Sequence, residues 1–411
     1  MKANILTLGC KVNRYESEVV AKELALRGWQ IGDSLEYADI YIINTCAVTA
    51  EASSKSRQMI ARAKKCNPAA GIYVIGCGSE FAPESYAKEQ VVYITGTNGK
   101  ERIVDIINKD YPVCFNKNIV LDTDNPYLVS RTRAFVKIQD GCDNACSYCI
   151  IPYLRGGSVS RPIDEIVAEA SGYARDYKEI VLVGINISLY GKDIGTNLAE
   201  LINALAAVPC RVRLSSFYIE GINEQLMLAL QRLHSFCDHF HLSVQSGDDA
   251  ILKDMNRRYN TAQCLEKIDL IRKYFPNCAI AADLIVGYPT ENEARFANTI
   301  KFVEQARFSD IHCFIFSPRK GTSAYQLSLP NRSIAKQRQA ILLSHAGVLR
   351  ANFLKENLNK EHEVLFEEVK GGIASGYTRN YIRAYSAKPY DGLQNVVSTS
   401  LYKDGLLVKG E

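Results

Sequence analysis

The 411-residue sequence contains no run of the roughly 20 consecutive apolar residues that a membrane-spanning helix needs, so a membrane span is excluded. The first residues, 1–9, are too few and too polar for the apolar core of a signal peptide. An excess of charge of one sign is also missing, since the net charge is only +4, and this value alone does not indicate nucleic-acid binding. With 47% hydrophobic and 23% charged residues, the composition is that of a globular protein, which we expect in the cytoplasm.

Cysteine is the one unusual residue type. The chain has 13 cysteines, an odd number, and without a secretion signal a disulfide scaffold is not expected. The cysteines are therefore either buried thiols or metal ligands, and their spacing must distinguish the two.

The first part of the chain, residues 1–125, alternates short apolar runs with amphipathic stretches. Such alternation predicts a parallel sheet with helices on both faces, a doubly wound α/β domain. The predicted strands are Asn4–Gly9, Asp39–Thr45, Ile72–Gly76 and Val91–Thr97, and the predicted helices are Tyr15–Arg27, Glu51–Cys66 and Gly99–Asn108.

The second part, residues 128–357, repeats the strand–helix pattern six times and closes with a long helix, Ser333–Asn357. Six repeats predict an open parallel (β/α)6 barrel, and Asp122–Pro126 is the expected linker before it. The predicted strands are Ala134–Ile138, Glu179–Val183, Arg211–Ser215, Phe240–Val244, Ala279–Val286 and Ile311–Phe316.

The third part, residues 358–411, has short alternating strands separated by glycine-rich turns, which predicts a small all-β barrel. The predicted strands are Glu363–Glu368, Gly371–Ser375, Tyr381–Tyr385 and Leu406–Lys409.

Cys142, Cys146 and Cys149 form a C-x3-C-x2-C motif directly after the first predicted barrel strand. Three thiolates in one loop suit a [4Fe–4S] cluster and leave one iron open for another ligand. The alternative is a structural zinc knuckle, which normally needs a fourth Cys or His, and the neighbouring sequence offers neither. The loop also follows a barrel strand at the end where such barrels place their chemistry.

Cys10, Cys46 and Cys77 each follow the carboxyl end of a predicted strand in the first part. In a doubly wound sheet these ends are neighbours, so the three thiols can meet although they are far apart in sequence. Any one of them alone would be interpreted as a buried thiol, but three together favour a second cluster. The other seven cysteines lack paired spacing, and we expect them in the core.

The C-x3-C-x2-C motif on this barrel pattern resembles the radical S-adenosylmethionine superfamily. The segments 7–17, 44–49 and 76–77, together with 149–156, resemble the methylthiotransferases within it, over essentially the whole chain. Leu8-Gly9-Cys10-Lys11-Val12-Asn13 is similar to the branch that acts on N6-threonylcarbamoyladenosine at position 37 of tRNA. Gly78-Ser79-Glu80 departs from the aromatic-Ala-Gln that the family often has after the third cysteine.

The resemblance implies two [4Fe–4S] clusters and S-adenosylmethionine, used both as radical source and as methyl donor. It implies an N-terminal cluster domain, a radical domain and a C-terminal TRAM domain. It also implies methylthiolation of C2 of the modified adenosine in a tRNA anticodon stem-loop, an electron donor such as flavodoxin or ferredoxin, and a source of sulfur. Catalytic residues other than the cluster ligands are not identified.

Polar residues at the ends of the later barrel strands are the candidates for holding S-adenosylmethionine, although some could simply be strand caps. Arg257 could pair with a carboxylate of this cofactor or with a phosphate. The candidates are Gly184, Asn186, Ser215, Gln245, Arg257 and Gly287.

RNA binding needs cations for phosphates and flat side chains for bases. Taken alone, a basic helix is usually a solvated face and tyrosines on strands usually pack in the sheet, so the resemblance to TRAM carries this prediction. The candidates are Lys55, Arg57, Arg379, Tyr381 and Arg383.

Three other functions stay open at this stage. A thiotransferase could insert sulfur without methylating it, which the departure at Gly78-Ser79-Glu80 allows. A related enzyme could act on another tRNA adenosine or on a ribosomal protein. A protein of another class, an RNA-binding iron–sulfur redox sensor, would also explain two clusters but gives the polar strand ends no role.

Overall fold

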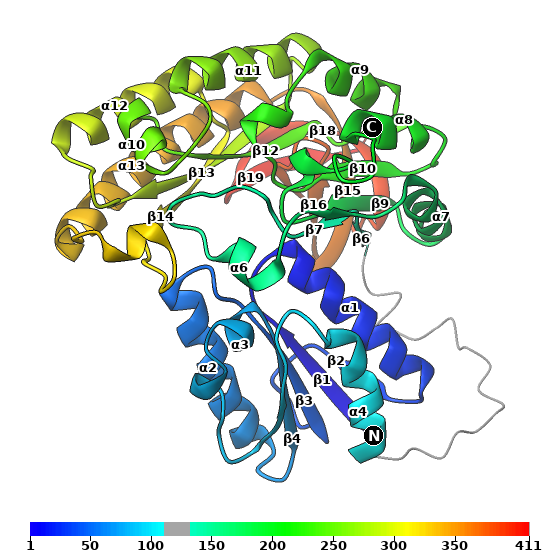
Figure 1. Cartoon of the computed structure of the whole chain (residues 1–411). Helices are drawn as coiled ribbons and strands as arrows, with labels where there is room; N and C mark the ends of the chain where they lie inside the picture. Colours follow the sequence, from blue (N-terminus) through cyan, green and yellow to red (C-terminus); the bar gives the residue numbers. More distant parts are fainter. Residues whose placement is uncertain (111–131, 411) are drawn as a thin grey trace. The chain divides into compact units, whose positions relative to one another are not determined.

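The computed structural model describes residues 1–110 and 132–410, which form two compact units (Figure 1). The first unit contains the described residues up to 110 together with 140–157 and 317–325. The second contains 132–139, 158–316 and 326–410. The predicted linker Asp122–Pro126 and Cys114 lie outside the described residues, and the predicted domain boundaries stay predictions.

The first unit is built on a parallel sheet of five strands in the order β2-β1-β3-β4-β5. Every residue of β3 and β4 is buried, as expected of continuous apolar strands covered on both faces. The order changes direction between β1 and β3, the place where such sheets bind ligands. The strands are β1 (Lys2–Thr7), β2 (Gln30–Gly32), β3 (Ile40–Thr45), β4 (Gly71–Gly76) and β5 (Val91–Ile94).

Helices cover both faces of this sheet, so the predicted doubly wound fold is confirmed. α1 (Lys11–Leu26) and α4 (Ile103–Asp110) pack on one face, where Leu24 and Ile107 join a core with Ile42. α2 (Ala50–Cys66) covers the other face. Two short helices complete the unit, α3 (Cys77–Phe81) and α6 (Ile151–Arg155).

The second unit contains the open parallel barrel predicted from the sequence. Seven of its strands form two sheets, in the orders β11-β10-β9-β6 and β12-β13-β14, joined by a parallel bridge between Phe217 and Leu242, and the short strands β7 and β8 form a separate two-stranded sheet. The strands are β6 (Arg133–Lys137), β7 (Gln139–Asp140), β8 (Val159–Ser160), β9 (Glu179–Val183), β10 (Arg211–Leu214), β11 (Ser235–Phe236), β12 (His239–Gln245), β13 (Ala279–Val286) and β14 (Asp310–Ile315).

Helices follow the barrel strands and bury one large apolar core against them, which includes Leu182, Leu242 and Leu284. The last helix packs against β14 and α12. The helices are α7 (Ile163–Tyr173), α8 (Leu198–Ala204), α9 (Glu224–Arg232), α10 (Asp249–Asp254), α11 (Thr261–Tyr274), α12 (Glu293–Ala306) and α13 (Arg332–Glu356).

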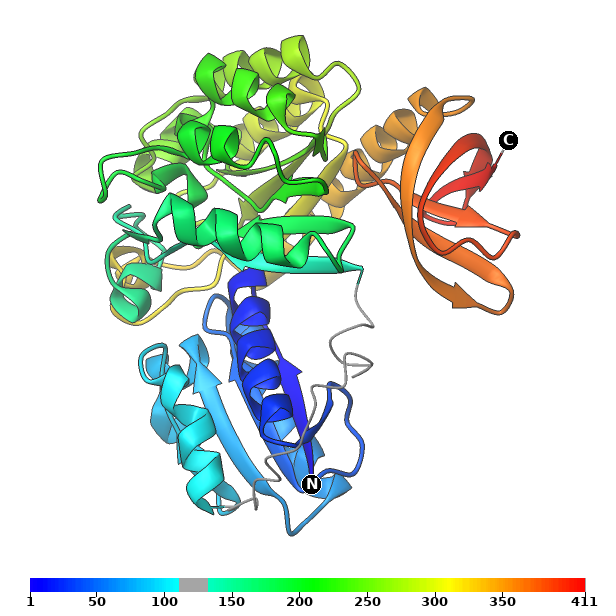
Figure 2. The same cartoon turned by 90° about the vertical axis from the view of Figure 1, so that its right-hand side faces the viewer.

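A closed β-barrel follows α13 in the second unit (Figure 2), with strand order β15-β16-β17-β19-β18. The strand predicted to begin at Tyr381 begins instead at Arg383. Tyr381 lies in a turn with φ +64°, and its N–H donates to the carbonyl of Thr378 at 3.1 Å. The sequence pattern also misses β2 and β18. The strands are β15 (Glu361–Lys370), β16 (Ile373–Thr378), β17 (Arg383–Ser386), β18 (Gly392–Tyr402) and β19 (Gly405–Lys409).

Candidate functional site

Cys10, Cys46 and Cys77 lie at the carboxyl ends of three adjacent strands of the first unit. Cys46 directly follows β3, Cys77 directly follows β4, and Cys10 stands between β1 and α1. Because β1, β3 and β4 are neighbours in the parallel sheet, their ends bring the three thiols to one edge.

Backbone geometry allows this approach at Gly9, where φ is +105°. A Cβ at this position would lie 3.2 Å from the Sγ of Cys46 and 3.0 Å from the side-chain nitrogen of Asn13, so a larger residue would enter the thiol site. Burial raises the pKa of the Cys46 thiol to about 11, and the nearby thiols of Cys10 and Cys77 act in the same direction. Metal binding at such thiols therefore has to displace their protons.

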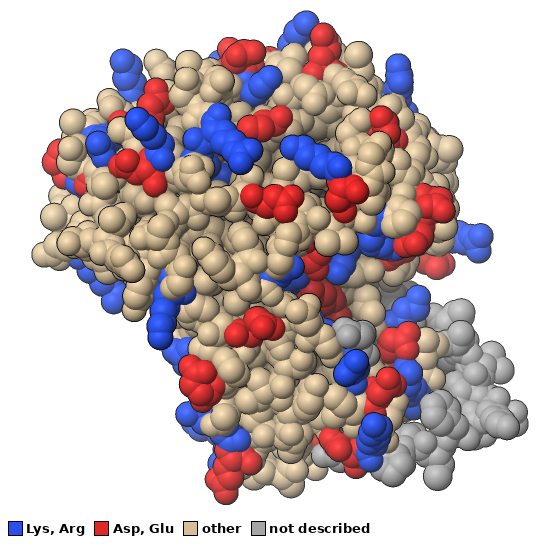
Figure 3. Space-filling view, viewed as in Figure 1, with Lys and Arg blue, Asp and Glu red and all other residues tan. Residues whose placement is uncertain are grey.

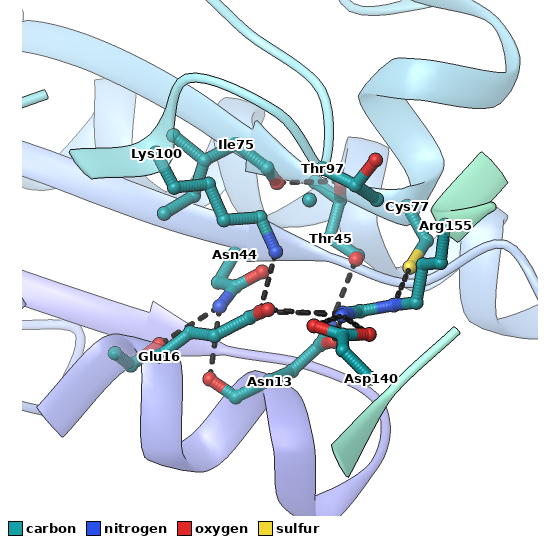
Figure 4. A network of polar contacts seen from close by, with 12 residues as sticks. Asn13, Glu16, Asn44, Thr45, Ile75, Cys77, Thr97, Lys100, Asp140 and Arg155 are labelled. Atoms are coloured by element: carbon teal, nitrogen blue, oxygen red, sulfur yellow. Dashed lines mark hydrogen bonds and ion pairs between the residues drawn. The ribbon is translucent and has the colours of Figure 1, made fainter. Parts of the chain in front are cut away.

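Arg155, at the end of α6, reaches the thiol site and is almost fully buried, with 2% of its side chain exposed (Figure 4). Its Nε donates to the Sγ of Cys77 at 3.2 Å, and its Nη2 donates to Oδ1 of Asn13 at 3.0 Å. Cys10 lies beside the same Asn13 oxygen, with Sγ at 3.7 Å. One guanidinium thus connects a thiol with the amide that lies next to a second thiol.

Two carboxylates balance the charge of Arg155. Its Nη1 pairs with Oδ1 of Asp140 at 2.9 Å and with Oε1 of Glu16 at 3.0 Å. Lys100 also binds Glu16, so two cations share this carboxylate (Figure 4). Burial by itself lowers the pKa of Arg155, but Cys77, Glu16 and Asp140 outweigh it and hold the pKa above its ordinary value, so the guanidinium stays charged.

A second buried cation, Arg319, belongs to the same unit and is 5% exposed. Its guanidinium lies 5.7 Å from the ring centre of Phe81 and acts on the Cys46 thiol by lowering its pKa against the effect of burial. Among the described residues its Nε has no hydrogen-bond partner. Positive charge therefore approaches the thiol trio from the Cys46 side as well as from the Cys77 side.

The departure at Gly78-Ser79-Glu80 has a structural role in α3. Ser79 is buried and its hydroxyl donates to the carbonyl of Thr95 at 2.6 Å. Glu80 accepts from the N–H of Thr97 at 2.9 Å, and the hydroxyl of Thr97 donates to the carbonyl of Leu154. Both residues fix the loop after β5, and through Thr97 this loop holds α6, which carries Arg155.

The loop with Cys142, Cys146 and Cys149 folds back on itself in the first unit. The N–H of Cys142 donates to the carbonyl of Gly156 at 3.1 Å, and Cys149 donates to Cys146 at 3.1 Å. The N–H of Asn144 points at the Sγ of Cys142 at 3.5 Å, as is common around cluster thiolates. Cys142 and Cys146 are buried.

Both trios fit iron–sulfur clusters by their donors. Each offers three thiols, and thiolate sulfur is the usual ligand of a [4Fe–4S] cluster. The trio at the sheet edge is also surrounded by the buried guanidinium groups of Arg155 and Arg319, which suit an anionic group. Three ligands from the protein leave the fourth iron of each cluster for another ligand.

The candidates for the cofactor lie in the second unit, five of them at the carboxyl ends of strands or just after them, and Arg257 between α10 and α11. Asn186 is buried and its Oδ1 accepts from the N–H of Ser188, so it caps a short helical turn. Ser215 is buried, and its hydroxyl has no hydrogen-bond partner among the described residues. Gln245, which ends β12, has a φ of +75°. A role for these three residues in binding the cofactor stays a prediction.

The other three cofactor candidates are held by close packing. The guanidinium of Arg257 lies over the ring of Tyr218, 4.5 Å from its centre. The N–H of Gly287 donates to Glu291 at 2.7 Å, and a Cβ there would meet Ala335 at 2.6 Å. A Cβ at Gly184 would likewise come too close to its neighbours, at 2.8 Å from Ile187 and 2.9 Å from Gln139.

The RNA candidates differ in exposure. Lys55 and Arg57 are exposed on α2, where Lys55 pairs with Glu51 at 2.7 Å. Arg379 donates from Nε to the carbonyl of Phe236 at 2.9 Å, and Arg383 lies 3.9 Å from Asp404.

Tyr381 is half-buried and packs against other side chains. Its ring stacks on Tyr377 at 4.7 Å, and the guanidinium of Arg213 lies 4.7 Å from its centre. The structure gives Tyr381 a packing role against the open barrel, and its predicted contact with RNA stays a prediction.

Charges of both signs are intermingled on the face drawn in Figure 3, in keeping with the small net charge of +4. None of the described helices is long and apolar enough to span a membrane.

Sequence reasoning missed the partners of Arg155. Arg155 falls within the segment 149–156 that carries the family resemblance, but the sequence assigns no role to it or to Glu16, Lys100 and Asp140. Nothing in the spacing of these four residues indicates a shared site, because they come from separate segments of the chain. The burial of charged side chains beside cysteines would have been the signal, and only the folded structure shows it.

Two family models match the chain. The Radical SAM superfamily covers residues 136–303, and the family described as "Uncharacterized protein family UPF0004" covers residues 2–96. The class predicted from the C-x3-C-x2-C motif is therefore confirmed.

Curated relatives extend over nearly the whole chain. Threonylcarbamoyladenosine tRNA methylthiotransferase MtaB of Thermotoga maritima is 37% identical over 92% of this chain and 90% of its own length. The protein of the same name from Bacillus subtilis is 33% identical over 97% and 93%, respectively. A tRNA-2-methylthio-N(6)-dimethylallyladenosine synthase of Fervidobacterium nodosum is 34% identical over 97% and 95%.

The chain belongs to the radical S-adenosylmethionine methylthiotransferase family, in the MtaB-like branch predicted from the sequence. It is a transferase, and its family uses S-adenosylmethionine and [4Fe–4S] clusters.

Solved structures confirm the fold. The radical S-adenosylmethionine methyltransferase TsrM of Kitasatospora setae matches with a TM-score of 0.56 at 12% identity, over 79% of this chain and 77% of that one. The cobalamin-dependent enzyme OxsB matches with a TM-score of 0.52 at 10% identity, over 86% and 56%.

Proposed function

We propose that the enzyme converts the C2–H of N6-threonylcarbamoyladenosine at position 37 of tRNA into C2–S–CH3, and that it acts in the cytoplasm. The MtaB relatives carry this substrate in their names. The observation that carries the proposal is the thiol trio at the edge of the first sheet, which Arg155 connects to segment 140–157 of the same unit, the segment that contains the C-x3-C-x2-C loop.

Two clusters follow from the two trios of thiols. Cys142, Cys146 and Cys149 would hold the first, and Cys10, Cys46 and Cys77 the second. When bound, the clusters and S-adenosylmethionine supply one-electron cleavage of the sulfonium and a sulfur atom that accepts a methyl group. An electron donor such as flavodoxin or ferredoxin and a source of sulfur are the partners that this chemistry requires.

The chain's own residues position and shield this chemistry. Arg155 holds Cys77 and the Asn13 amide beside Cys10, and it keeps its charge because Glu16 and Asp140 flank it. Burial of Cys46, Cys77, Cys142 and Cys146 limits access of water to the thiolates. Thr97 and Glu80 hold the end of α6, which fixes the position of Arg155.

Mass spectrometry of tRNA nucleosides from cells with and without this gene tests the function. We expect threonylcarbamoyladenosine to gain SCH3 and lose H only when the gene is present. A gain of sulfur alone would instead favour the non-methylating thiotransferase. Unchanged threonylcarbamoyladenosine together with a new methylthio group on another adenosine would contradict the proposed substrate.

Iron analysis tests the two clusters separately from the substrate. After anaerobic reconstitution we expect about eight iron atoms per chain, and about four in either Cys46→Ala or Cys146→Ala. Cys264→Ala is the matched control, because this thiol is buried in the core of the second unit and its loss should leave the iron content unchanged. Equal iron in Cys46→Ala and the unmodified chain would remove the second cluster from the proposal.

A further inference from the structure

His241, Asp283 and His312 lie side by side on β12, β13 and β14. In the strand register, Asp283 lies opposite His312, and His241 lies opposite Ala281, two residues before Asp283. Side chains alternate along a strand, and the neighbours Leu242 and Ala282 belong to the apolar core beneath the helices. The trio therefore faces the opposite side of the sheet, away from that core.

The three side chains also meet at their polar atoms. Nε2 of His241 lies 2.9 Å from Oδ1 of Asp283, and Nδ1 of His312 lies 3.4 Å from the same oxygen. All three ligand atoms are within 4.8 Å of one another, and no other set of three described His, Cys, Asp or Glu side chains meets this spacing. A divalent metal with bonds of about 2.0–2.2 Å separates its ligand atoms by about 3–3.5 Å.

We propose that His241, Asp283 and His312 form a binding site for one divalent first-row transition-metal ion, separate from the cysteine sites. Two imidazole nitrogens and one carboxylate oxygen are a donor set for Zn²⁺, Fe²⁺ and related ions, whereas cluster iron is held by thiolates. Ligands on three adjacent strands occupy one side of the ion, so its other positions can bind water or a ligand.

Exposure of the trio suits an exchangeable ion. The side chains of His241 and Asp283 are 13% and 20% exposed, which limits solvent around the ion, and His312 is 46% exposed, which gives access. The site begins four residues before Gln245 on β12 and four before Gly287 on β13, about 13 Å below the strand ends. It therefore does not coincide with Gln245 and Gly287, the candidates for S-adenosylmethionine on the same two strands.

Zinc binding to the reconstituted holoprotein tests this site. The protein is incubated anaerobically with a small excess of Zn²⁺, desalted and analysed for metal. We expect one zinc per chain more in the unmodified protein than in Asp283→Asn or His312→Gln. X-ray absorption at the zinc edge should show nitrogen and oxygen neighbours and no sulfur, and Zn²⁺ should raise the melting temperature of the unmodified protein but not of these two variants.

His345→Ala is the matched control. Nδ1 of His345 lies 3.1 Å from Glu304, so this variant removes another exposed histidine–carboxylate pair, and we expect full zinc binding. Circular dichroism and iron content check that each variant is folded. Equal zinc in the unmodified protein, Asp283→Asn and His312→Gln would overturn the site and leave a plain hydrogen-bonded trio. Zinc–sulfur scattering would overturn it as well, because the ion would then lie on cysteines.

Discussion

Each unit of the molecule buries an ionic network, and the central residues of the two networks have opposite charges. In the first unit one cation, Arg155, is surrounded by Glu16, Asp140 and a thiol. In the second unit one anion, Glu179, is fully buried among arginines of neighbouring strands, with Arg211 and Arg213 both at 2.6 Å and Arg133 at 3.2 Å.

The two networks also differ in what they hold. The arginines around Glu179 reach from the open barrel to the closed one, where Arg213 donates to the carbonyl of Arg379 at 3.2 Å and lies over Tyr381. Arg155 reaches a cysteine. Glu179 begins strand β9, and the start of a barrel strand is remote from the chemistry of such barrels. The network around Glu179, the anion-centred network, therefore contributes to stability. The network around Arg155, the cation-centred network, additionally places a positive charge next to the thiols of a candidate cluster.

Glu179→Gln should have the largest effect on stability. The substitution leaves three buried guanidinium groups without their shared carboxylate, and we expect a loss of about 3–5 kcal/mol in the free energy of unfolding. Urea unfolding followed by circular dichroism measures it. Glu363→Gln is the control, because Glu363 is 28% exposed and lies farther from Arg211, at 3.7 Å, so its loss should cost only about 1 kcal/mol. Equal losses of stability in Glu179→Gln and Glu363→Gln would mean that the network around Glu179 has no special role in stability.

Arg155→Lys should have a smaller effect on stability and a specific effect on the thiol site. One ammonium cannot keep the contacts with Cys77, Asn13 and both carboxylates, so we expect a loss of about 1.5–3 kcal/mol. Without the donor to Cys77, the reduction potential of a cluster on this trio should become more negative.

This shift is measurable by redox titration with electron paramagnetic resonance, in protein whose Cys142, Cys146 and Cys149 are all replaced by Ala. Arg161→Lys serves as control, because Arg161 binds Glu169 in the second unit. An unchanged potential in Arg155→Lys would mean that the network is only structural, like that around Glu179.

Tyr381→Leu tests whether the anion-centred network includes the closed barrel. The ring stacks on Tyr377 and lies against Arg213, so its loss should cost about 1–2 kcal/mol of stability. Urea unfolding and titration with tRNA measure stability and binding separately. Unchanged stability with weaker tRNA binding would favour the RNA contact predicted from the sequence.

The positions of Cys10, Cys46 and Cys77 were predictable because each follows a strand, and the ends of parallel strands meet at one edge of a sheet. Cys142, Cys146 and Cys149 were predictable as a group from their spacing within one loop. The two networks were not. Glu179 and Arg211 begin apolar strands, where a pattern based on hydrophobicity expects no charge, and they are buried only because they pair across the register of β9 and β10. Asp283 lies within the predicted strand Ala279–Val286, but only the pairing of β12, β13 and β14 brings it next to His241 and His312.

The smallest effect concerns acid stability of the cation-centred network. Burial raises the pKa of Glu16, but Lys100 and Arg155 outweigh it and hold the pKa below its usual value of about 4.5. The carboxylate therefore stabilises the fold fully above that value, and this contribution is lost as the pH falls below it. In metal-free protein, Glu16→Gln should be less stable than the unmodified chain at pH near 7, with a difference that shrinks toward pH of about 3.

Fluorescence of Trp29, the single tryptophan of the chain, reports unfolding of the first unit, because this side chain is buried in its core. Glu23→Gln on the same helix is the matched control, since Glu23 is 46% exposed beside Arg27 and should change stability little at either pH. If the deficit of Glu16→Gln were the same at both pH values, the carboxylate would gain nothing from its two cations. Packing, and not the ion pairs of Glu16, would then stabilise this part of the first unit. The network around Arg155 would resemble the network around Glu179 in its geometry but would not stabilise the fold as that network does.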